Sequence, residues 1–278
     1  MLNVQIASPE ALLRPFIRSY VQREARLGAE SQVEPVVARL GVMLEFAFAG
    51  SYEVRQYGSN TLAATFPISI IGPQSWRRYR LIIRGHIESL VVMFQPAGCH
   101  ALSGTPTAPL AGAGTEGHSV LGKQVSILHE QLGNLQTFSE RVQRLDRYFL
   151  HQLSDGCMLD PIYKALHLLT MAGPPVRVDD VARQMGSNRR YLERKALMYS
   201  GVSPKALTLI ARFSRALQLR SDTSLTWTQI AQSAGYHDHM HMIRDFRVFA
   251  GGAPTSALQD ITEDHLIHFA HSKNLQLG

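Results

Sequence analysis

Large apolar residues recur at every second position in parts of the first half of the chain, which is the period of a β-strand with one buried face. The clearest case is the segment 42–48, whose alternating apolar residues are Val42, Leu44, Phe46 and Phe48. Segments 52–57, 66–71, 79–84 and 87–94 also have strand character, and glycine-containing turns separate them. Short strands divided by turns predict an antiparallel sheet or a small barrel.

A helical period flanks these strands. Ser8 can cap a helix, Pro9 suits its first position and Glu10 favours its positive end. The apolar residues that follow at helical spacing are Leu12, Leu13, Phe16, Ile17, Tyr20 and Val21. Two further helices are expected at about 119–133 and 138–153, after a loop of small residues at 103–117.

The second half of the chain has a different pattern. From Asp160 onward it shows helices and tight turns without strand periodicity, so we place a domain boundary at residues 154–156, Ser-Asp-Gly. A length of 278 residues agrees with two domains. The predicted fold class is α+β: an N-terminal antiparallel sheet or small barrel with flanking helices (1–155), an all-α C-terminal domain (160–262) and a tail (263–278).

The C-terminal half contains an internal repeat with a spacing of 49 residues at first and 50 later. Each copy has a helix that ends at a glycine, then a capping residue, then a second helix. This is the helix-turn-helix, whose second helix enters the major groove. The copies are expected at about 178–200 and 227–250. The matching pairs are Val181 and Ile230, Ala182 and Ala231, Gly186 and Gly235, Asn188 and Asp238, Leu192 and Met242, Arg194 and Arg244, Gly201 and Gly251, and Pro204 and Pro254.

A long helix is expected between the two copies, at about 204–220. Its apolar face is formed mainly by Ala206, Leu207, Ile210, Phe213 and Leu217, with Arg220 at the end. A helix of this length spans about 26 Å. It would hold the two reading helices at roughly one turn of DNA, about 34 Å, so that a single chain contacts two successive major grooves.

The two copies, VARQMGSNRRYLERKALMYSGVSP from Val181 and IAQSAGYHDHMHMIRDFRVFAGGAP from Ile230, resemble the double helix-turn-helix domain of the AraC/XylS family of transcription regulators. The resemblance covers about 100 residues. In the first half, GPQ at Gly72 and FQPAGCHAL from Phe94 resemble a subgroup of the same family. The sequence departs from the family's usual residues at Ala196, Met240, Met242, Gly252 and Ala253.

The resemblance implies a cytoplasmic, sequence-specific regulator that associates with the bacterial nucleoid when it is bound to DNA. Its implied partner is double-stranded DNA, and RNA polymerase, a small-molecule effector and a second copy of the chain are further candidates. The residues at the family's DNA-facing positions are Asn188, Arg189, Arg190, Glu193, Arg194, His239, Met240, His241, Ile243 and Arg244.

These side chains suit base and phosphate recognition. Arginine pairs with guanine O6 and N7, and glutamate accepts a hydrogen bond from cytosine N4. Two alternatives remain: Arg189 contacts only a phosphate, or Arg194 and Arg244 form ion pairs within the domain.

Charge and cysteine content agree with a DNA-binding protein of a reducing compartment. The formal net charge is +6, and residues 160–260 carry 13 Lys and Arg against 8 Asp and Glu. Two cysteines exclude a disulfide framework. The first residues do not form a signal-peptide pattern and no apolar run has membrane-spanning length, so no membrane partner is expected.

The strand-rich half is expected to bind an effector, to dimerise, or both. Candidate effector-binding residues are Arg39, Glu45, Tyr57, Gln74, Trp76 and Arg80. A stripe at helical spacing fits either a dimer interface or an intramolecular core. It consists of Leu121, Val125, Leu128 and Leu132.

Signals for other ligands are weak. Residues 112–117 match G-x-G-x-x-G but follow a Pro/Thr/Ala segment, so a flexible loop is expected in place of a dinucleotide site. His237 and His241 have the spacing for zinc, but no third ligand is evident, so no metal or cofactor is expected. Partly protonated histidines near phosphates, His239 included, instead predict tighter DNA binding at lower pH.

Signals for catalysis are equally weak. Glu45 and Glu88 are expected to be solvated strand residues that do not pair as acid and base, and Cys99 is expected to be a buried structural thiol. We therefore propose no catalytic residue. The alternatives are an enzyme or effector-binding protein with an accessory helical domain, or a protein whose basic helices bind an acidic partner.

Overall fold

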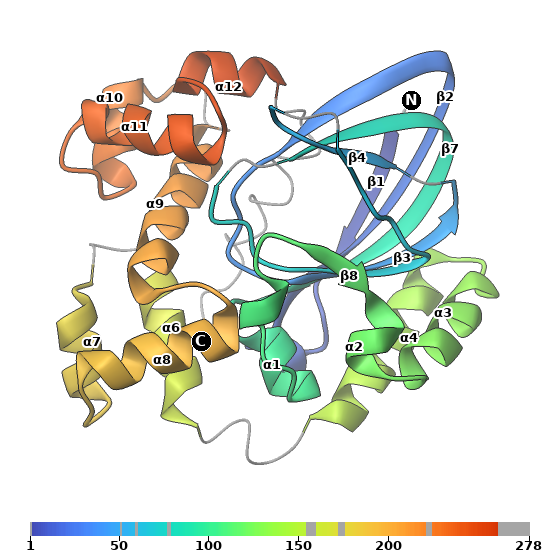
Figure 1. Ribbon diagram of the computed structural model, residues 1–278, viewed down its shortest axis with the longest axis horizontal. Helices are drawn as coiled ribbons and strands as arrows, with labels where there is room; N and C mark the ends of the chain where they lie inside the picture. Colours follow the sequence, from blue (N-terminus) through green and yellow to red (C-terminus); the bar gives the residue numbers. More distant parts are fainter. Residues whose placement is uncertain are drawn as a thin grey trace.

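The structure is a computed structural model in which a β-sheet lies beside a group of helices from the second half of the chain (Figure 1). The predicted domain boundary at 154–156 and the predicted tail at 263–278 lie outside the residues that the structure describes. Within the described ranges, none of the helices combines the length and the apolar character that crossing a membrane requires. The described residues are 2–50, 52–58, 61–76, 79–153, 160–171, 176–220 and 224–260.

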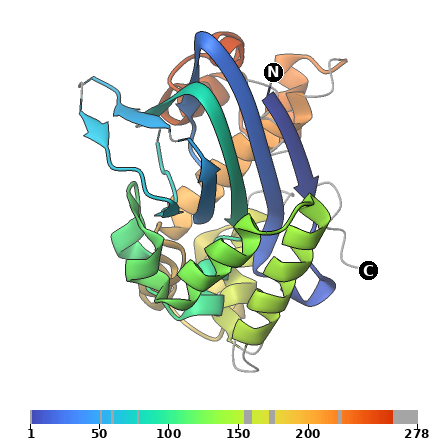
Figure 2. The ribbon, with the colours of Figure 1, turned by 90° about the vertical axis from the view of Figure 1, so that its right-hand side faces the viewer.

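The first half forms an eight-stranded antiparallel sheet, in which β1, β2, β7, β3, β6 and β8 pair in that order and β4 pairs with β5 and β7. The two longest strands, β2 and β7, pair along most of their length and curve together (Figure 2). The predicted fold class is thereby confirmed for this half. The strands are β1 (Leu2–Ala7), β2 (Ile17–Val36), β3 (Met43–Ala49), β4 (Glu53–Gln56), β5 (Leu62–Ala63), β6 (Ile68–Ile71), β7 (Tyr79–Phe94) and β8 (Gly114–Glu116).

The helix predicted from Ser8 is wrong. Only Ala11–Leu13 form a 3-10 turn, and the chain then continues as strand β2. Pro15 has no backbone N–H and disfavours the helical conformation of the residue before it, so a helix cannot run through this point easily. Tyr20 and Val21, expected on one helical face, instead join different apolar clusters on opposite faces of the sheet.

Two further segments differ from expectation. The strands predicted at 79–84 and 87–94 are one strand, β7, in which Gly85 has a φ of 65°. The partner strand β2 carries a register shift between Arg26 and Ser31, opposite this point. The small-residue segment expected to be a flexible loop contains strand β8, which pairs with β6. Side-chain pattern could not find β8, because three residues that include a glycine have no periodicity.

Helices cover one face of the sheet. Helices α3 (Gln124–Gly133) and α4 (Phe138–Gln152) follow α2 (Gly117–Leu121), and Gly122, with a φ of 77°, separates α2 from α3. Three members of the predicted stripe are fully buried, so it serves the intramolecular core and not a dimer interface. The cluster between helices and sheet includes Leu44, Phe46, Leu90, Val92, Val125, Leu128, Leu132, Leu145 and Phe149.

The second half is helical, as predicted. The turns after α7 and α10 contain Gly186 and Gly235, whose φ values of 65° and 85° suit glycine. The helices are α6 (Pro161–Thr170), α7 (Val178–Gln184), α8 (Arg189–Ser200), α9 (Pro204–Arg220), α10 (Trp227–Ser233), α11 (His239–Phe249) and α12 (Pro254–Asp260). These bounds agree with the expected helix-turn-helix copies and with the helix expected between them. A short helix, α1 (Gly98–Ser103), and a 3-10 turn, η2 (Ala108–Leu110), connect the sheet to this half.

Helix α9 is the centre of the second core. It contacts α6, α8, α10 and α11, and its buried residues include Leu207, Ile210 and Leu217. The ring of Phe213 lies 5.0 Å from that of Phe246 and 5.4 Å from that of Phe249, between ring centroids. Both helix-turn-helix copies therefore pack on one helix.

We predict that Phe213→Ala lowers the free energy of unfolding by about 3–5 kcal/mol, because a fully buried aromatic side chain leaves a cavity that the surroundings fill only partly. Urea titration followed by far-UV circular dichroism measures this change. The matched control is Met240→Ala, since the Met240 side chain is 62% exposed, and its effect should stay within about 0.5 kcal/mol. A loss below about 1 kcal/mol for Phe213→Ala would show that α9 does not organise this core.

Candidate nucleic-acid interface

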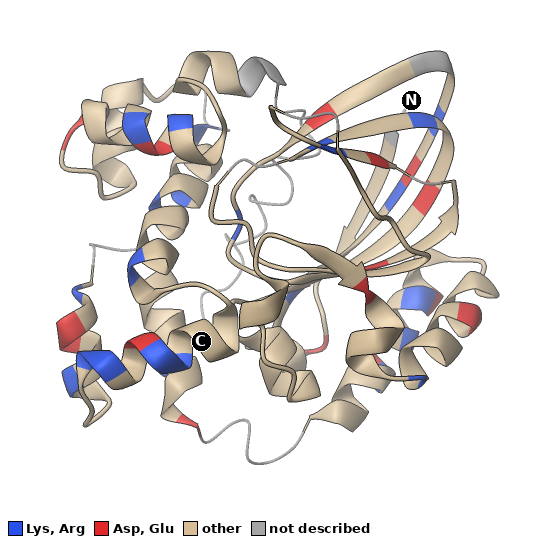
Figure 3. Cartoon of the chain, viewed as in Figure 1, with Lys and Arg blue, Asp and Glu red and all other residues tan. Residues whose placement is uncertain are grey.

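The second helices of the two copies, α8 and α11, lie near opposite ends of α9, in the helical part of the molecule beside the sheet (Figure 1). Each begins at a residue whose side chain accepts a hydrogen bond from the backbone three residues later: Asn188 from Tyr191, and Asp238 from His241. Lys and Arg mark the chain along α8, α9 and α11 (Figure 3). Neither reading helix is buried.

Helix α8 presents its basic residues to solvent. Arg189, Arg190 and Arg194 are exposed, whereas Leu192 and Ala196 are buried against the core. These three arginines are among the residues expected to face DNA, and that expectation stays a prediction. Asn188 is exposed as well, but its side-chain oxygen is engaged in capping the helix.

The arginines of α8 differ in their surroundings. Arg189 Nε donates to Glu193 Oε1 at 2.8 Å, and its Nη1 lies 3.6 Å from Asp179 Oδ1. The hydrogen bond to Glu193 and these two carboxylates hold the pKa of Arg189 above its usual value. Arg194 lies over the Tyr191 ring at 5.6 Å, and neither Arg190 nor Arg194 forms an ion pair with any described residue. Two carboxylates thus orient the Arg189 side chain, while the charges of Arg190 and Arg194 are not neutralised by any described residue.

Helix α11 repeats this arrangement. Met240, His241 and Arg244 are exposed, and His239 and Ile243 are partly exposed. Met242 and Phe246 are buried in the core. Asp245, the residue after Arg244, forms an ion pair with Arg212 of α9 at 3.4 Å and so does not pair with Arg244. Across the described chain Arg244 has no ion-pair partner, so the intradomain ion pair considered for Arg194 and Arg244 is not what the structure shows.

Sequence reasoning missed one basic residue of this face. Arg247 is exposed and lies one turn after Arg244 on α11. Helical spacing could have indicated Arg247, because residues three apart on a helix are neighbours and Arg244 was already expected on this face. The repeat gives no signal for Arg247, because the first copy has Leu197 at the corresponding place.

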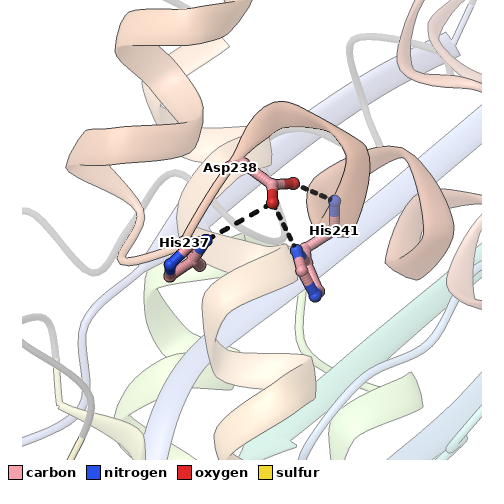
Figure 4. Close-up of side chains that lie close together, drawn as sticks. All are labelled: His237, Asp238 and His241. Atoms are coloured by element: carbon pink, nitrogen blue, oxygen red, sulfur yellow. Dashed lines mark hydrogen bonds and ion pairs between the residues drawn. The ribbon is translucent and has the colours of Figure 1, made fainter.

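Three side chains converge at the start of α11 (Figure 4). Asp238 Oδ2 accepts from His241 Nδ1 at 2.9 Å and from His237 Nδ1 at 3.4 Å, and Oδ1 accepts from the His241 backbone N–H at 2.8 Å. These bonds, the backbone one first, hold the pKa of Asp238 well below its usual range.

The histidine cluster corrects one expectation. Asp238 supplies the third potential metal ligand that the sequence did not make evident, and the ligand atoms lie within 4.8 Å of one another. All three residues are exposed, and the carboxylate already caps the helix. A cation here would compete with those hydrogen bonds at the positive end of the helix dipole.

The N-terminal half contacts the C-terminal end of each reading helix. The Thr107 N–H and hydroxyl donate to the Met198 carbonyl of α8 at 2.9 and 3.1 Å. The Ala38 N–H donates to the Phe249 carbonyl of α11 at 2.9 Å. These bonds satisfy carbonyls that a helix end leaves without an intrahelical partner.

A ring contact joins the same halves. His100 stacks on Tyr199 with centroids 3.8 Å apart, and the Tyr199 hydroxyl donates to Asp160 at 2.9 Å. Gly201 ends α8 with a φ of 74°, and a Cβ there would lie 2.9 Å from both Pro73 Cγ and the Thr107 carbonyl oxygen. Only glycine fits this position without displacement. The neighbouring Cys99 is buried, and burial raises the pKa of its thiol to about 12, in keeping with the expected structural role.

The face of the sheet opposite α3 and α4 lines a cavity of about 340 Å³. Of the predicted effector residues, Arg39, Glu45 and Gln74 line it, while Tyr57, Trp76 and Arg80 do not. Tyr57 lies beyond the end of β4, and Trp76 is 49% exposed. Arg80 lies between the lining residues Tyr79 and Leu81 on β7, so strand alternation points it to the other face.

Glu45 and Glu88, which were expected to be solvated, are both only partly exposed. Burial raises the pKa of Glu45, which faces Arg23 and hydrogen-bonds the hydroxyls of Ser89 and Tyr52. Glu88 instead pairs with Arg141 at 2.6 Å. The two carboxylates therefore interact with different arginines and do not act as an acid–base pair.

Comparison with known protein sequences gives one family match and one relative. A sequence model of the family described as "Helix-turn-helix domain" matches residues 181–260. The Msm operon regulatory protein of Streptococcus mutans serotype c (strain ATCC 700610 / UA159) is 24% identical over 108 residues, which is 39% of this chain and 38% of that relative. The chain thus matches less than half the length of this curated relative.

Solved structures give weaker likenesses. ToxT from Vibrio cholerae O395 has a TM-score of 0.49 and 16% identity, over 87% of this chain and 98% of that chain. The AraC-like transcriptional activator CuxR has a TM-score of 0.29 and 15% identity, over 74% of this chain and 90% of that chain. The sequence match at residues 181–260 coincides with the two helices, the connecting helix and the exposed basic faces described above. This part of the chain is therefore a helix-turn-helix domain.

Proposed function

We propose that this protein is a sequence-specific DNA-binding transcription regulator whose helices α8 and α11 read two successive major grooves. The observation that carries the proposal is the packing of both helix-turn-helix copies on α9, with exposed arginines on each reading helix. Helix α9 has 17 residues and so spans about 26 Å, which suits two reading helices about one DNA turn, roughly 34 Å, apart.

We further infer that the N-terminal half regulates this activity through an effector in its cavity. Arg39 and Gln74 line the cavity, and their backbones form a two-way bridge, with N–H to oxygen distances of 2.9 and 3.1 Å. Ala38, which donates to the end of α11, precedes Arg39, and Pro73, which packs against the end of α8, precedes Gln74. A change in the cavity wall at this bridge would therefore reach both reading helices.

Selection from random DNA tests the proposed function. Full-length protein is mixed with duplexes that carry a random segment, and bound molecules are sequenced after several rounds. The proposal requires a site with two recognised segments, one for each reading helix, about one helical turn apart. Recovery of unrelated sequences with the same affinity as the starting pool would overturn it.

We predict that Arg194→Ala and Arg244→Ala each weaken binding to the selected site by about 1–3 kcal/mol, if each arginine contacts a base. Fluorescence anisotropy at fixed salt measures the dissociation constant. Arg147→Ala is the matched control, because Arg147 is exposed on α4, away from the reading helices. The assignment of both reading helices is wrong if the two substitutions leave the affinity at the control's value.

A further inference from the structure

One arginine in the wall of the cavity, Arg18, has no partner among the described residues. Arg18 lies on β2 at the register shift between Ile17 and Ser19, and it lines the cavity. It forms no hydrogen bond or ion pair with any residue that the structure describes, and burial lowers the pKa of its guanidinium. A cation that is withdrawn from water without a counter-charge is costly, and a bound anion would offset that cost.

The other charged groups at the cavity are compensated. Arg23 Nη2 forms an ion pair with the buried Glu34 at 2.9 Å. The carboxylate of Glu45 lies near the positive charges of Arg23 and Arg39 and accepts hydrogen bonds from the hydroxyls of Ser89 and Tyr52. Among the described residues, three arginines (Arg18, Arg23 and Arg39) are thus matched by two carboxylates (Glu34 and Glu45), so one positive charge is left over. This balance opposes a cationic ligand and favours an anionic one.

A second arginine of the wall is incompletely bonded. Arg39 is buried, and its Nη2 donates to the Gly72 carbonyl at 3.1 Å. Its Nε has no hydrogen-bond partner in the part of the chain that the structure describes. Burial lowers the pKa of Arg39 to about 10, so the guanidinium remains charged at neutral pH. The planar donor set of arginine matches a carboxylate in two-point geometry.

Much of the remaining wall is apolar. Met43, Val91 and Met93 cover the sheet side, and Phe66 and Pro67 lie on the segment that leads into β6. A volume of about 340 Å³ is at the lower end of the range for small-molecule sites, roughly 300–1,000 Å³. The chemistry of the wall therefore combines an unpaired cation with an apolar chamber.

We propose that this cavity binds a small organic acid, with its carboxylate at Arg18 and Arg39 and its apolar body against Met43, Val91 and Met93. The inference deepens the effector role given to the N-terminal half under the proposed function. The binding itself does not depend on DNA, so it is measured without DNA.

The test compares acids with their uncharged amides on the full-length protein. The probes are benzoate and benzamide, cyclohexanecarboxylate and cyclohexanecarboxamide, and octanoate and octanamide. Thermal shift assays and calorimetry report binding, because a ligand that binds only the folded state raises the Tm. At least one acid should bind about tenfold or more tighter than its own amide, since a charge-assisted hydrogen bond is lost in the amide.

Arg18→Gln should remove this preference, so that the acid binds about as weakly as the amide while the amide's affinity stays unchanged. Arg26→Gln is the matched control, because Arg26 lies on the same strand with its side chain exposed, and it should keep the preference. Equal binding of acids and amides, no Tm shift with any acid, or an unchanged preference in Arg18→Gln overturns the proposal. DNA selection on the same preparation separates this failure from a failure of the proposed function.

Discussion

The shared packing of both helix-turn-helix copies on α9 is the constraint on which the rest of the structure depends. A helix-turn-helix cannot bury its own apolar face alone, and here one helix supplies the missing surface for two copies. Phe213 lies against Phe246 and Phe249 of α11, while Leu207 and Ile210 belong to the same core as Leu192 of α8. The separation of the reading helices is therefore set by a rigid element and not by a flexible linker. Under the proposed function, that geometry would join two groove contacts into a single contact surface.

The N-terminal half forms hydrogen bonds with the C-terminal ends of both α8 and α11. Thr107 bonds to the last turn of α8, and Ala38 bonds to the last turn of α11. The residues next to these contacts also form the bridge between Arg39 and Gln74 at the wall of the cavity. Under the proposed function, a shift in this wall would be passed to these contacts, because closely packed interiors transmit strain. A short run of contacts thus joins the cavity wall to the ends of α8 and α11, although these residues are far apart in sequence.

Sequence reasoning was strongest where local rules decide the structure. The helices of the second half follow from caps, glycine turns and periodicity, and Asn188, Gly186 and Gly235 have the roles expected of them. The same reasoning failed where distant pairing decides. The helical spacing after Ser8 was outweighed by Pro15 and by the pairing of β2 with β7. Burial of Glu45 could not be read from the sequence, because its partners Arg23, Tyr52 and Ser89 come from three other parts of the chain.

Hydroxyl-radical footprinting of the full-length protein on its selected duplex tests the central claim most directly, because it maps where one chain protects the DNA backbone. Two recognition helices fixed on α9 predict two protected patches on one face of the duplex, about 10.5 base pairs apart, at a ratio of one chain per site. The same two patches should persist when solution conditions keep the protein monomeric. A single patch, or two patches that require two chains, would contradict the account.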